Sequence, residues 1–165
     1  MLRWKHPSGE FIPPDRFIPI AEQSGLIVAM GRWLLPEALR TLKRFQQAGF
    51  EHLRMAVNVS SIQLRQPSFL DFVNETLAET GTSPNFLELE ITESIALEGL
   101  EAMIALLTSL RSQGIRIAID DFGTGYSSLN YLERLPIDHL KIDRSFVLSL
   151  AASERGARIV RTIAM

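Results

Sequence analysis

Short apolar segments alternate with longer amphipathic segments along most of this chain. The short segments are rich in β-branched residues, and their length and composition predict β-strands. Strands are expected at residues 2–4, 54–59, 86–91, 115–119 and 139–142. The longer segments repeat apolar residues three or four positions apart, which predicts helices with one buried face. Helices are expected at residues 15–24, 26–48, 68–80, 100–113 and 154–164.

The order of these elements predicts the fold class. A glycine follows each of the first four expected helices, as is common where a helix ends: Gly25, Gly49, Gly81 and Gly114. Strands that alternate with helices indicate a parallel sheet with helical crossovers, either an open doubly wound sheet or a (β/α) barrel. No glycine-rich dinucleotide loop follows the first strand, and the segment at 123–128 lacks the lysine of a phosphate-binding loop. The favoured fold is therefore an α/β barrel of the TIM type.

Polar side chains stand near the carboxyl-terminal ends of the expected strands. They are Asn58, Glu90, Asp120, Asp121, Lys141 and Asp143. In a barrel these strand ends converge on one face, where barrel enzymes place their chemistry. Each residue alone has a simpler interpretation, as a turn residue, an ion-pair partner or a surface lysine. Their recurrence on four successive strands favours a shared site.

The residue types at these strand ends suit metal chemistry. Carboxylate and amide oxygens are hard ligands, which favour Mg²⁺ or Mn²⁺ over zinc or copper. Two adjacent aspartates can hold one metal each or bridge two, and a metal pair can polarise a phosphodiester and generate a hydroxide. A lysine can orient that water or neutralise developing charge. Metal-assisted phosphoester hydrolysis is the first hypothesis, and an enolase-type proton abstraction would use similar groups.

Composition and charge narrow the function classes. The chain has 165 residues and fits one domain. Its formal charge of −2 offers no basic excess for binding the backbone of DNA or RNA. The absence of cysteine excludes disulfides and thiolate metal sites. No apolar run is long enough for a membrane segment and no signal peptide is evident, so the default expectation is a cytoplasmic domain, alone or within a larger membrane-anchored protein.

Long segments of the chain resemble the EAL domain family. The similar stretches are residues 2–27, 57–64 (VNVSSIQL), 87–94 (LELEITES) and 117–147, with DDFGTGYSSL and LPIDHLKIDRSF as the most specific motifs, and the final helix GARIVRTIA. They follow the order and spacing of the family and cover essentially the whole chain. The resemblance implies a (β/α) barrel with an irregular first strand.

The resemblance also implies an activity and its residues. Members of the family hydrolyse cyclic di-GMP, a bacterial second messenger, to linear pGpG with Mg²⁺ or Mn²⁺, and Ca²⁺ inhibits them. The motifs then make Asn58, Glu90, Asp120 and Asp121 the metal ligands and Lys141 the residue that positions the attacking water. They make Glu93 the brace of the loop at 122–128, Arg3 a phosphate contact and Asp143 a supporting substrate residue.

Two departures from the family pattern lead to a further expectation. The Glu-Ala-Leu tripeptide would stand just before Leu2, and the later strands with their EGVE-type and QGY-type segments would follow Met165. A full barrel has about 250 residues. The expected domain, residues 1–165, is therefore a partial EAL domain, truncated at both ends, which is expected to be feebly active or inactive by itself.

Three function hypotheses remain at this point. The first is the cyclic di-GMP phosphodiesterase. The second is a catalytically silent EAL-like receptor or protein-interaction module, and ligand binding without turnover would distinguish it. The third is an unrelated Mg²⁺-dependent barrel, such as an enolase-type lyase. The resemblance also implies a homodimer, to which the loop after Asp121 and the next helix would contribute Tyr126, Leu129, Tyr131 and Leu132.

Overall fold

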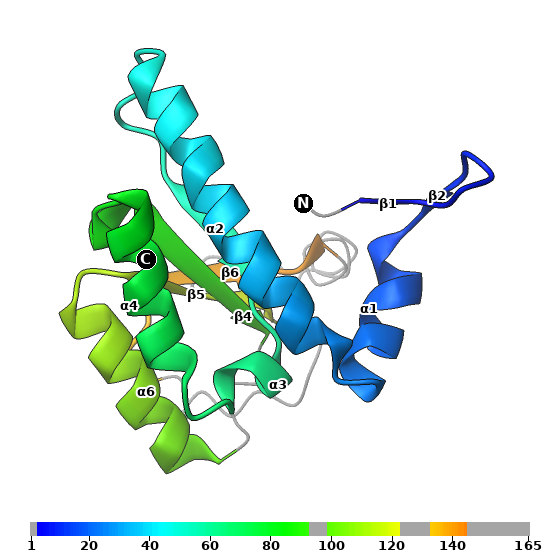
Figure 1. Cartoon of the computed structure of the whole chain (residues 1–165). Coiled ribbons are helices and arrows are strands. Elements are labelled where there is room, and N and C mark those ends of the chain that lie inside the picture. Colours follow the sequence, from blue (N-terminus) through cyan, green and yellow to red (C-terminus); the bar gives the residue numbers. More distant parts are fainter. Residues whose placement is uncertain (1–2, 93–98, 123–132, 145–165) are drawn as a thin grey trace, which may run out of the picture. The chain divides into compact units, whose positions relative to one another are not determined.

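The computed structural model describes residues 3–92, 99–122 and 133–144 (Figure 1). The chain divides into two compact units. The first contains a small hairpin and four helices: β1 (Trp4–Lys5), β2 (Phe11–Ile12), α1 (Pro14–Gln23), α2 (Leu26–Gln47), α3 (Ser61–Leu64) and α4 (Phe69–Thr80). The described part of the second contains a sheet, a short 3₁₀ helix and one longer helix: β3 (Met55–Asn58), η1 (Pro84–Phe86), β4 (Leu87–Thr92), α6 (Leu100–Ser112), β5 (Arg116–Phe122) and β6 (His139–Ile142).

The long helix α2 organises the first unit. Its buried residues recur at helical spacing, with Ile27, Leu35, Leu39 and Leu42 on one face, and they pack against α1 and α4. Full burial of each such side chain contributes roughly 1.5–3 kcal/mol. The helix ends at Gln47, followed by Gly49 with a φ of 98°. That left-handed conformation is open to glycine and stops the helix where the sequence predicted.

A close approach joins α2 to α3. Gly31 of α2 faces the side chain of Gln63, and a Cβ atom at Gly31 would lie only 1.8 Å from Gln63 Nε2. Gln63 in turn accepts the backbone N–H of Ser60 through Oε1 at 3.1 Å, as part of a capping box at the start of α3. A side chain at position 31 would therefore force the end of the Gln63 side chain, and with it the capping contact to Ser60, to move.

The second unit is built on a parallel sheet with the strand order β3-β4-β5-β6 (Figure 1). Neighbouring strands pair in chain order, with α6 as the crossover between β4 and β5 and packed against β5. Sequential parallel strands joined by helices are the repeating unit of a (β/α) barrel. The α/β fold class with sequential parallel strands is confirmed.

The two faces of this sheet differ in polarity because residues alternate along each strand. One face is apolar and its side chains are almost fully buried: Leu87, Leu89, Ile91, Ile117 and Ile119. Leu107 and Leu110 of α6 are also fully buried. The opposite face carries Glu88, Glu90, Asp120, His139 and Lys141. The core of the unit thus lies on one side of the sheet, and its polar chemistry lies on the other.

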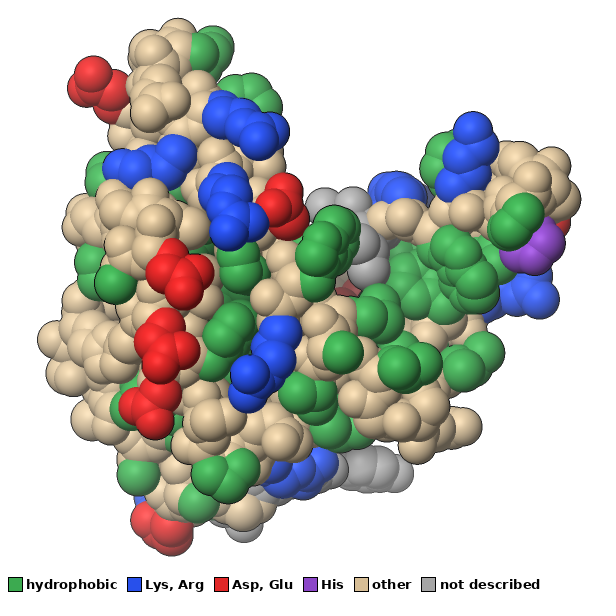
Figure 2. All heavy atoms as spheres, in the orientation of Figure 1, with side chains coloured by type: hydrophobic (Ala, Val, Ile, Leu, Met, Phe, Trp, Pro, Cys, Tyr) green, Lys and Arg blue, Asp and Glu red, His purple; other side chains and the backbone are tan. Residues whose placement is uncertain are grey.

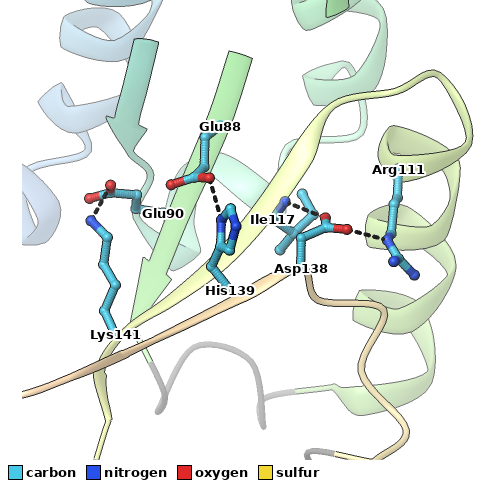
Figure 3. Close-up of polar contacts among 7 residues, drawn as sticks. All are labelled: Glu88, Glu90, Arg111, Ile117, Asp138, His139 and Lys141. Atoms are coloured by element: carbon cyan, nitrogen blue, oxygen red, sulfur yellow. Dashed lines mark hydrogen bonds and ion pairs between the residues drawn. The ribbon is translucent and has the colours of Figure 1, made fainter. Parts of the chain in front are cut away.

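Asp138 ties three elements of this unit together. Its carboxylate accepts the backbone N–H of Ile117 at 3.0 Å and the Nε–H of Arg111 at 2.9 Å (Figure 3). Its own backbone N–H donates to the carbonyl of Ile117 at 2.8 Å. The end of α6 and the starts of β5 and β6 are therefore fixed to one another through one side chain.

The sequence-based boundaries agree closely with the observed ones for most elements. The predicted strand at 139–142 is β6, and the predicted helix at 26–48 is α2, one residue shorter. Near the strand expected at 2–4 the structure has β1, which shares only Trp4 with that prediction and pairs antiparallel with β2. The pattern did not predict β2, α3 or η1. The expected helix at 154–164 lies outside the described residues. No helix among the described residues is long and apolar enough to cross a membrane.

Candidate active site

The strand pairing brings most of the expected site residues onto neighbouring positions of one sheet face. Asn58 of β3 is in register with Glu90 of β4, and Glu90 is in register with Ala118 of β5. Thr92 is in register with Asp120, one step nearer the carboxyl ends of the strands. In-register residues of parallel strands share a face, so Asn58, Glu90 and Asp120 lie on the same side of the sheet.

A β-bulge places both aspartates opposite Lys141. Ile119 pairs with Leu140 and Phe122 pairs with Ile142, so β5 advances three residues where β6 advances two. Asp120 and Asp121 therefore occupy the place that faces Lys141, as in a bulge where two residues oppose one. Asp121 has a φ of 55°, the one positive value at a non-glycine position among the described residues. Bulges and left-handed residues of this kind are frequent next to active sites.

Lys141 forms an ion pair with Glu90 across the intervening strand. The Lys141 ammonium donates to Oε1 of Glu90 (Figure 3). The Glu90 side chain is 7% exposed and the Lys141 side chain is 40% exposed, so the carboxylate is enclosed while the lysine reaches solvent. β5 lies between the two strands, and its small, fully buried Ala118 is in register with Glu90 on one side and His139 on the other. A larger side chain at Ala118 would separate the two groups.

A second ion pair lies one step nearer the amino ends of the same strands. His139 Nδ1 and Glu88 Oε2 are 2.6 Å apart (Figure 3). This pair was not predicted, because only polar residues near the carboxyl ends of the strands were singled out as site residues, and Glu88 and His139 lie earlier in their strands. A signal was present: the motifs Glu-Leu-Glu at 88–90 and His-Leu-Lys at 139–141 repeat polar residues two apart, which places both polar residues of each motif on one face.

Negative charge accumulates around Asp121. Partial burial and then the charges of Asp120 and Asp143 raise the pKa of Asp121 above its ordinary value, while Lys141 opposes the shift. Partial burial alone would lower the pKa of Lys141, but the hydrogen bond and charge of Glu90, with the charges of Asp120 and Glu88, outweigh it and raise the pKa above its usual value. The lysine is therefore held in its charged form among carboxylates.

The donor chemistry at this end of the sheet fits a hard divalent cation. Among the described residues, no three His, Cys, Asp or Glu side chains stand close enough together to form a metal site by themselves. Asp120 and Asp121 nevertheless share one level of the sheet, and their oxygens are the ligand type that Mg²⁺ and Mn²⁺ prefer. A cation held there would offset the like-charge repulsion that raises the pKa of Asp121.

The remaining predicted site residues have other positions. Asp143 directly follows β6, donates its backbone N–H to the carbonyl of Phe122 at 3.1 Å and acts on Asp121 by its charge. Arg3 belongs to the first unit, where it lines a mostly apolar hollow of about 510 Å³ with Trp4, Lys5, Phe17 and Trp33 (Figure 2). Glu93 lies outside the described residues. So do the loop residues after Phe122 and the proposed dimer contacts Tyr126, Leu129, Tyr131 and Leu132.

Comparisons with known proteins give a consistent result. The EAL domain family model matches residues 1–165. Cyclic di-GMP phosphodiesterase NbdA of Pseudomonas aeruginosa is 45% identical over 163 residues, which cover 99% of this chain and 21% of that protein. The bifunctional diguanylate cyclase/cyclic di-GMP phosphodiesterase MucR of the same organism is 44% identical over 163 residues, covering 99% of this chain and 24% of that protein.

Solved structures share the fold as well. A structure of the MucR phosphodiesterase in complex with c-di-GMP superposes with a TM-score of 0.91 and 44% sequence identity, over 99% of this chain and 66% of the solved chain. The chain spans less than a quarter of the length of these two curated relatives.

Proposed function

Because the chain belongs to the EAL domain family, we propose that it is a phosphodiesterase module that hydrolyses cyclic di-GMP to linear pGpG with the help of Mg²⁺ or Mn²⁺. The observation that carries this proposal is the bulge in β5, which sets Asp120 and Asp121 opposite Lys141, the ion-pair partner of Glu90. The phosphodiesterase activities for which NbdA and MucR are named agree with it.

The proposed roles follow from the positions of the side chains. Asn58, Glu90, Asp120 and Asp121 are proposed to hold the metal, and a bound divalent cation polarises a phosphodiester and lowers the pKa of a water ligand. The Lys141 ammonium stands among these carboxylates, where it can orient the attacking water and stabilise negative charge on the phosphoryl oxygens. By family resemblance, Arg3 is proposed to contact a phosphate, Asp143 to support the substrate and Glu93 to brace the loop after β5.

One observation favours a second candidate function, that of a receptor that binds cyclic di-GMP without cleaving it. Lys141 pairs with Glu90, which is itself a proposed metal ligand, and among the residues that the structure describes no three acidic or histidine side chains converge. A site in that arrangement offers two adjacent carboxylates and a lysine ammonium. These groups suffice to bind cyclic di-GMP but not to activate a water molecule for its hydrolysis.

Turnover and binding, measured separately, distinguish the two candidates. The chain is incubated with cyclic di-GMP and Mg²⁺, Mn²⁺ or Ca²⁺, product is followed by chromatography, and binding is measured by calorimetry. The phosphodiesterase proposal expects pGpG with Mg²⁺ or Mn²⁺, loss of product in Asp121→Asn, and no product with Ca²⁺. Asp71→Asn changes an exposed acid of α4 and is the matched control, expected to match the wild type.

Each outcome has one meaning. Product in the wild type and in Asp71→Asn, but not in Asp121→Asn, supports the enzyme. Binding without product in any cation supports the receptor. Neither binding nor product refutes both. Light scattering on the same samples tests the homodimer that the resemblance implies.

A further inference from the structure

β6 is a short strand, and its alternating pattern does not by itself fix its register against β5. Before the bulge, His139 pairs with Ala118 and Leu140 pairs with Ile119. Polar and apolar side chains alternate along β6, so a slip by two residues would keep each side chain on its present face. Such a slip would move Lys141 by roughly 6.6 Å along the strand. Something other than the alternation must therefore set the height at which Lys141 stands.

Asp138, the residue just before β6, engages both main-chain groups of Ile117 in β5. Its backbone N–H donates to the carbonyl of Ile117 at 2.8 Å. Its side-chain Oδ2 accepts the N–H of Ile117 at 3.0 Å (Figure 3). Both hydrogen bonds join the start of β6 to one particular residue of β5. A slip by two residues would break both of them.

Arg111 holds the same carboxylate from a second direction. Its Nε–H donates to Oδ1 of Asp138 at 2.9 Å, so both carboxylate oxygens have a donor (Figure 3). Arg111 stands in the last turn of α6, which leads into β5 rather than into β6. Arg111, Asp138 and Ile117 thus form a register clamp between these elements. The ion pair of Lys141 with Glu90 is less suited to this task, because a lysine side chain is long and flexible.

We propose that Asp138 is a positioning residue for Lys141: through the register clamp, it holds β6 at the height that sets Lys141 opposite the bulge in β5. The inference deepens the proposed function and rests on it, because Lys141 is the residue proposed to orient the attacking water. In the observed register Lys141 is level with the bulge. After a slip by two residues towards the amino ends of the strands, it would be level with Ala118 and away from both aspartates of the bulge.

Turnover by three variants tests the role of the Asp138 carboxylate. Asp138→Leu keeps the branched shape but has no acceptor, whereas Asp138→Asn keeps one oxygen that can accept the N–H of Ile117. Met103→Ala removes buried atoms from α6 about two turns before Arg111, and it is the control for a loss of stability alone. Each variant is assayed with cyclic di-GMP and Mn²⁺ at a temperature at which circular dichroism shows it to be folded.

The effect is expected in kcat, because Lys141 is proposed to act on the reacting groups. We expect Asp138→Leu to lower kcat about tenfold and to change KM by less than about twofold, since residues that orient a catalytic group have effects of this size. Asp138→Asn should stay within about threefold of the wild-type kcat, and Met103→Ala within about twofold. A kcat for Asp138→Leu within about twofold of the wild type overturns the proposal, and so does an equal loss in Met103→Ala.

A second readout reports the register itself and does not depend on turnover. The chain has no cysteine of its own, so two introduced cysteines can be followed without interference. Ile119→Cys with Leu140→Cys matches the observed register, with Cα atoms roughly 4.8 Å apart. Ile117→Cys with Leu140→Cys is two residues out of register, at roughly 8 Å, which is too far for a disulfide without backbone movement. The ratio of the two bridging rates therefore measures how firmly β6 keeps its register.

The register clamp predicts how this ratio responds to Asp138. We expect Asp138→Leu to lower the ratio about tenfold, the size of effect that loss of a charge-assisted hydrogen bond produces. Asp138→Asn and Met103→Ala should leave it within about twofold of its value in the parent pairs. An unchanged ratio in Asp138→Leu overturns the proposal. If the wild type produces no pGpG, the proposed function fails, and the ratio still decides whether Asp138 sets the register of β6.

Discussion

Replacing Asp121 by asparagine tests whether negative charge is crowded at the carboxyl end of β5. Partial burial and then the charges of Asp120 and Asp143 raise the pKa of Asp121, and Lys141 only partly offsets them. The ionised carboxylate is therefore less favourable in the folded chain than in the unfolded chain. Asparagine accepts the φ of 55° as readily as aspartate does, so the substitution removes a charge without straining the backbone.

The size of the stability change in Asp121→Asn follows from the exposure of the Asp121 side chain. Asp121 is exposed, so solvent screens its repulsion from Asp120 and Asp143, and each such contact is worth a fraction of 1 kcal/mol. We expect Asp121→Asn to stabilise the metal-free chain by about 0.5–1 kcal/mol at neutral pH. For a chain of this size that gain raises the melting temperature by about 1–4 °C.

The pH dependence has a definite sign. Since the folded pKa lies above the unfolded one, the stability linked to protonated Asp121 is fully present below the ordinary value of 3.8 and is lost as the pH rises through the folded pKa. The wild type and the variant should therefore have the same stability at pH values below about 3.8. The advantage of the variant should grow as the pH rises towards neutrality.

Thermal unfolding followed by circular dichroism checks this expectation, with EDTA present and then with Mn²⁺. With the cation, the order should reverse, because a cation at 100 times its dissociation constant adds about 2.7 kcal/mol to the protein that binds it. A variant less stable than the wild type in EDTA at pH 7 would refute the argument from charge crowding. An unchanged order in Mn²⁺ would refute the role of Asp121 as a metal ligand.

Four other substitutions probe the sheet. Lys141→Met should lower the free energy of unfolding, measured in urea, by about 1–3 kcal/mol, because it leaves the enclosed Glu90 carboxylate without its cation. Glu90→Gln should lower the same free energy by less than about 1 kcal/mol, because the Lys141 ammonium reaches solvent. Ala118→Val should lower it by about 1–3 kcal/mol, since the position is fully buried, and should also reduce cyclic di-GMP turnover more than Asp71→Asn does. Asp138→Ala should lower the free energy of unfolding by about 1–3 kcal/mol, because the backbone N–H of Ile117 loses its acceptor. A loss below about 0.5 kcal/mol in the same urea titration would contradict this account.

The long elements were predictable because each carries its own periodicity. The helix at 26–48 repeats apolar residues over several turns and stops at a glycine, and α2 follows that pattern to within one residue. The strand at 139–142 is bounded by Asp138, which turns the chain, and it was placed without error. A repeat of apolar residues over several turns distinguishes a helix from a strand even where single residues favour neither. The presence and type of these longer elements could therefore be predicted from the sequence.

The short elements could not be predicted in this way. β1 and β2 have two residues each and α3 has four, which is less than one clear period of either pattern. The hairpin depends on the pairing of Trp4 with Ile12 across a turn. Such elements are fixed by contacts between residues distant in the chain, and composition alone carries little information about them.

The bulge in β5 was within reach of the sequence. Ile117 and Ile119 keep a spacing of two, and the next buried apolar residue, Phe122, comes three positions later. That break in the alternation requires an extra residue on the strand, and Asp120 and Asp121 fill the interval. Two adjacent acids in a regular strand would point to opposite faces. The interrupted spacing is what brings both towards Lys141.

The two ion pairs on the polar face required the tertiary structure, because they join strands that are not neighbours. Glu88 pairs with His139 and Glu90 with Lys141, and in each case β5 lies between the partners. Stability alone does not account for a charged Glu90. A carboxylate enclosed to this degree carries a large desolvation penalty, and replacing a buried ion pair by apolar residues is often neutral or stabilising. An apolar residue at position 90 would suit a sheet whose other face is already apolar. The metal chemistry proposed for the strand ends gives the charge at Glu90, paired with Lys141, a role that folding alone does not.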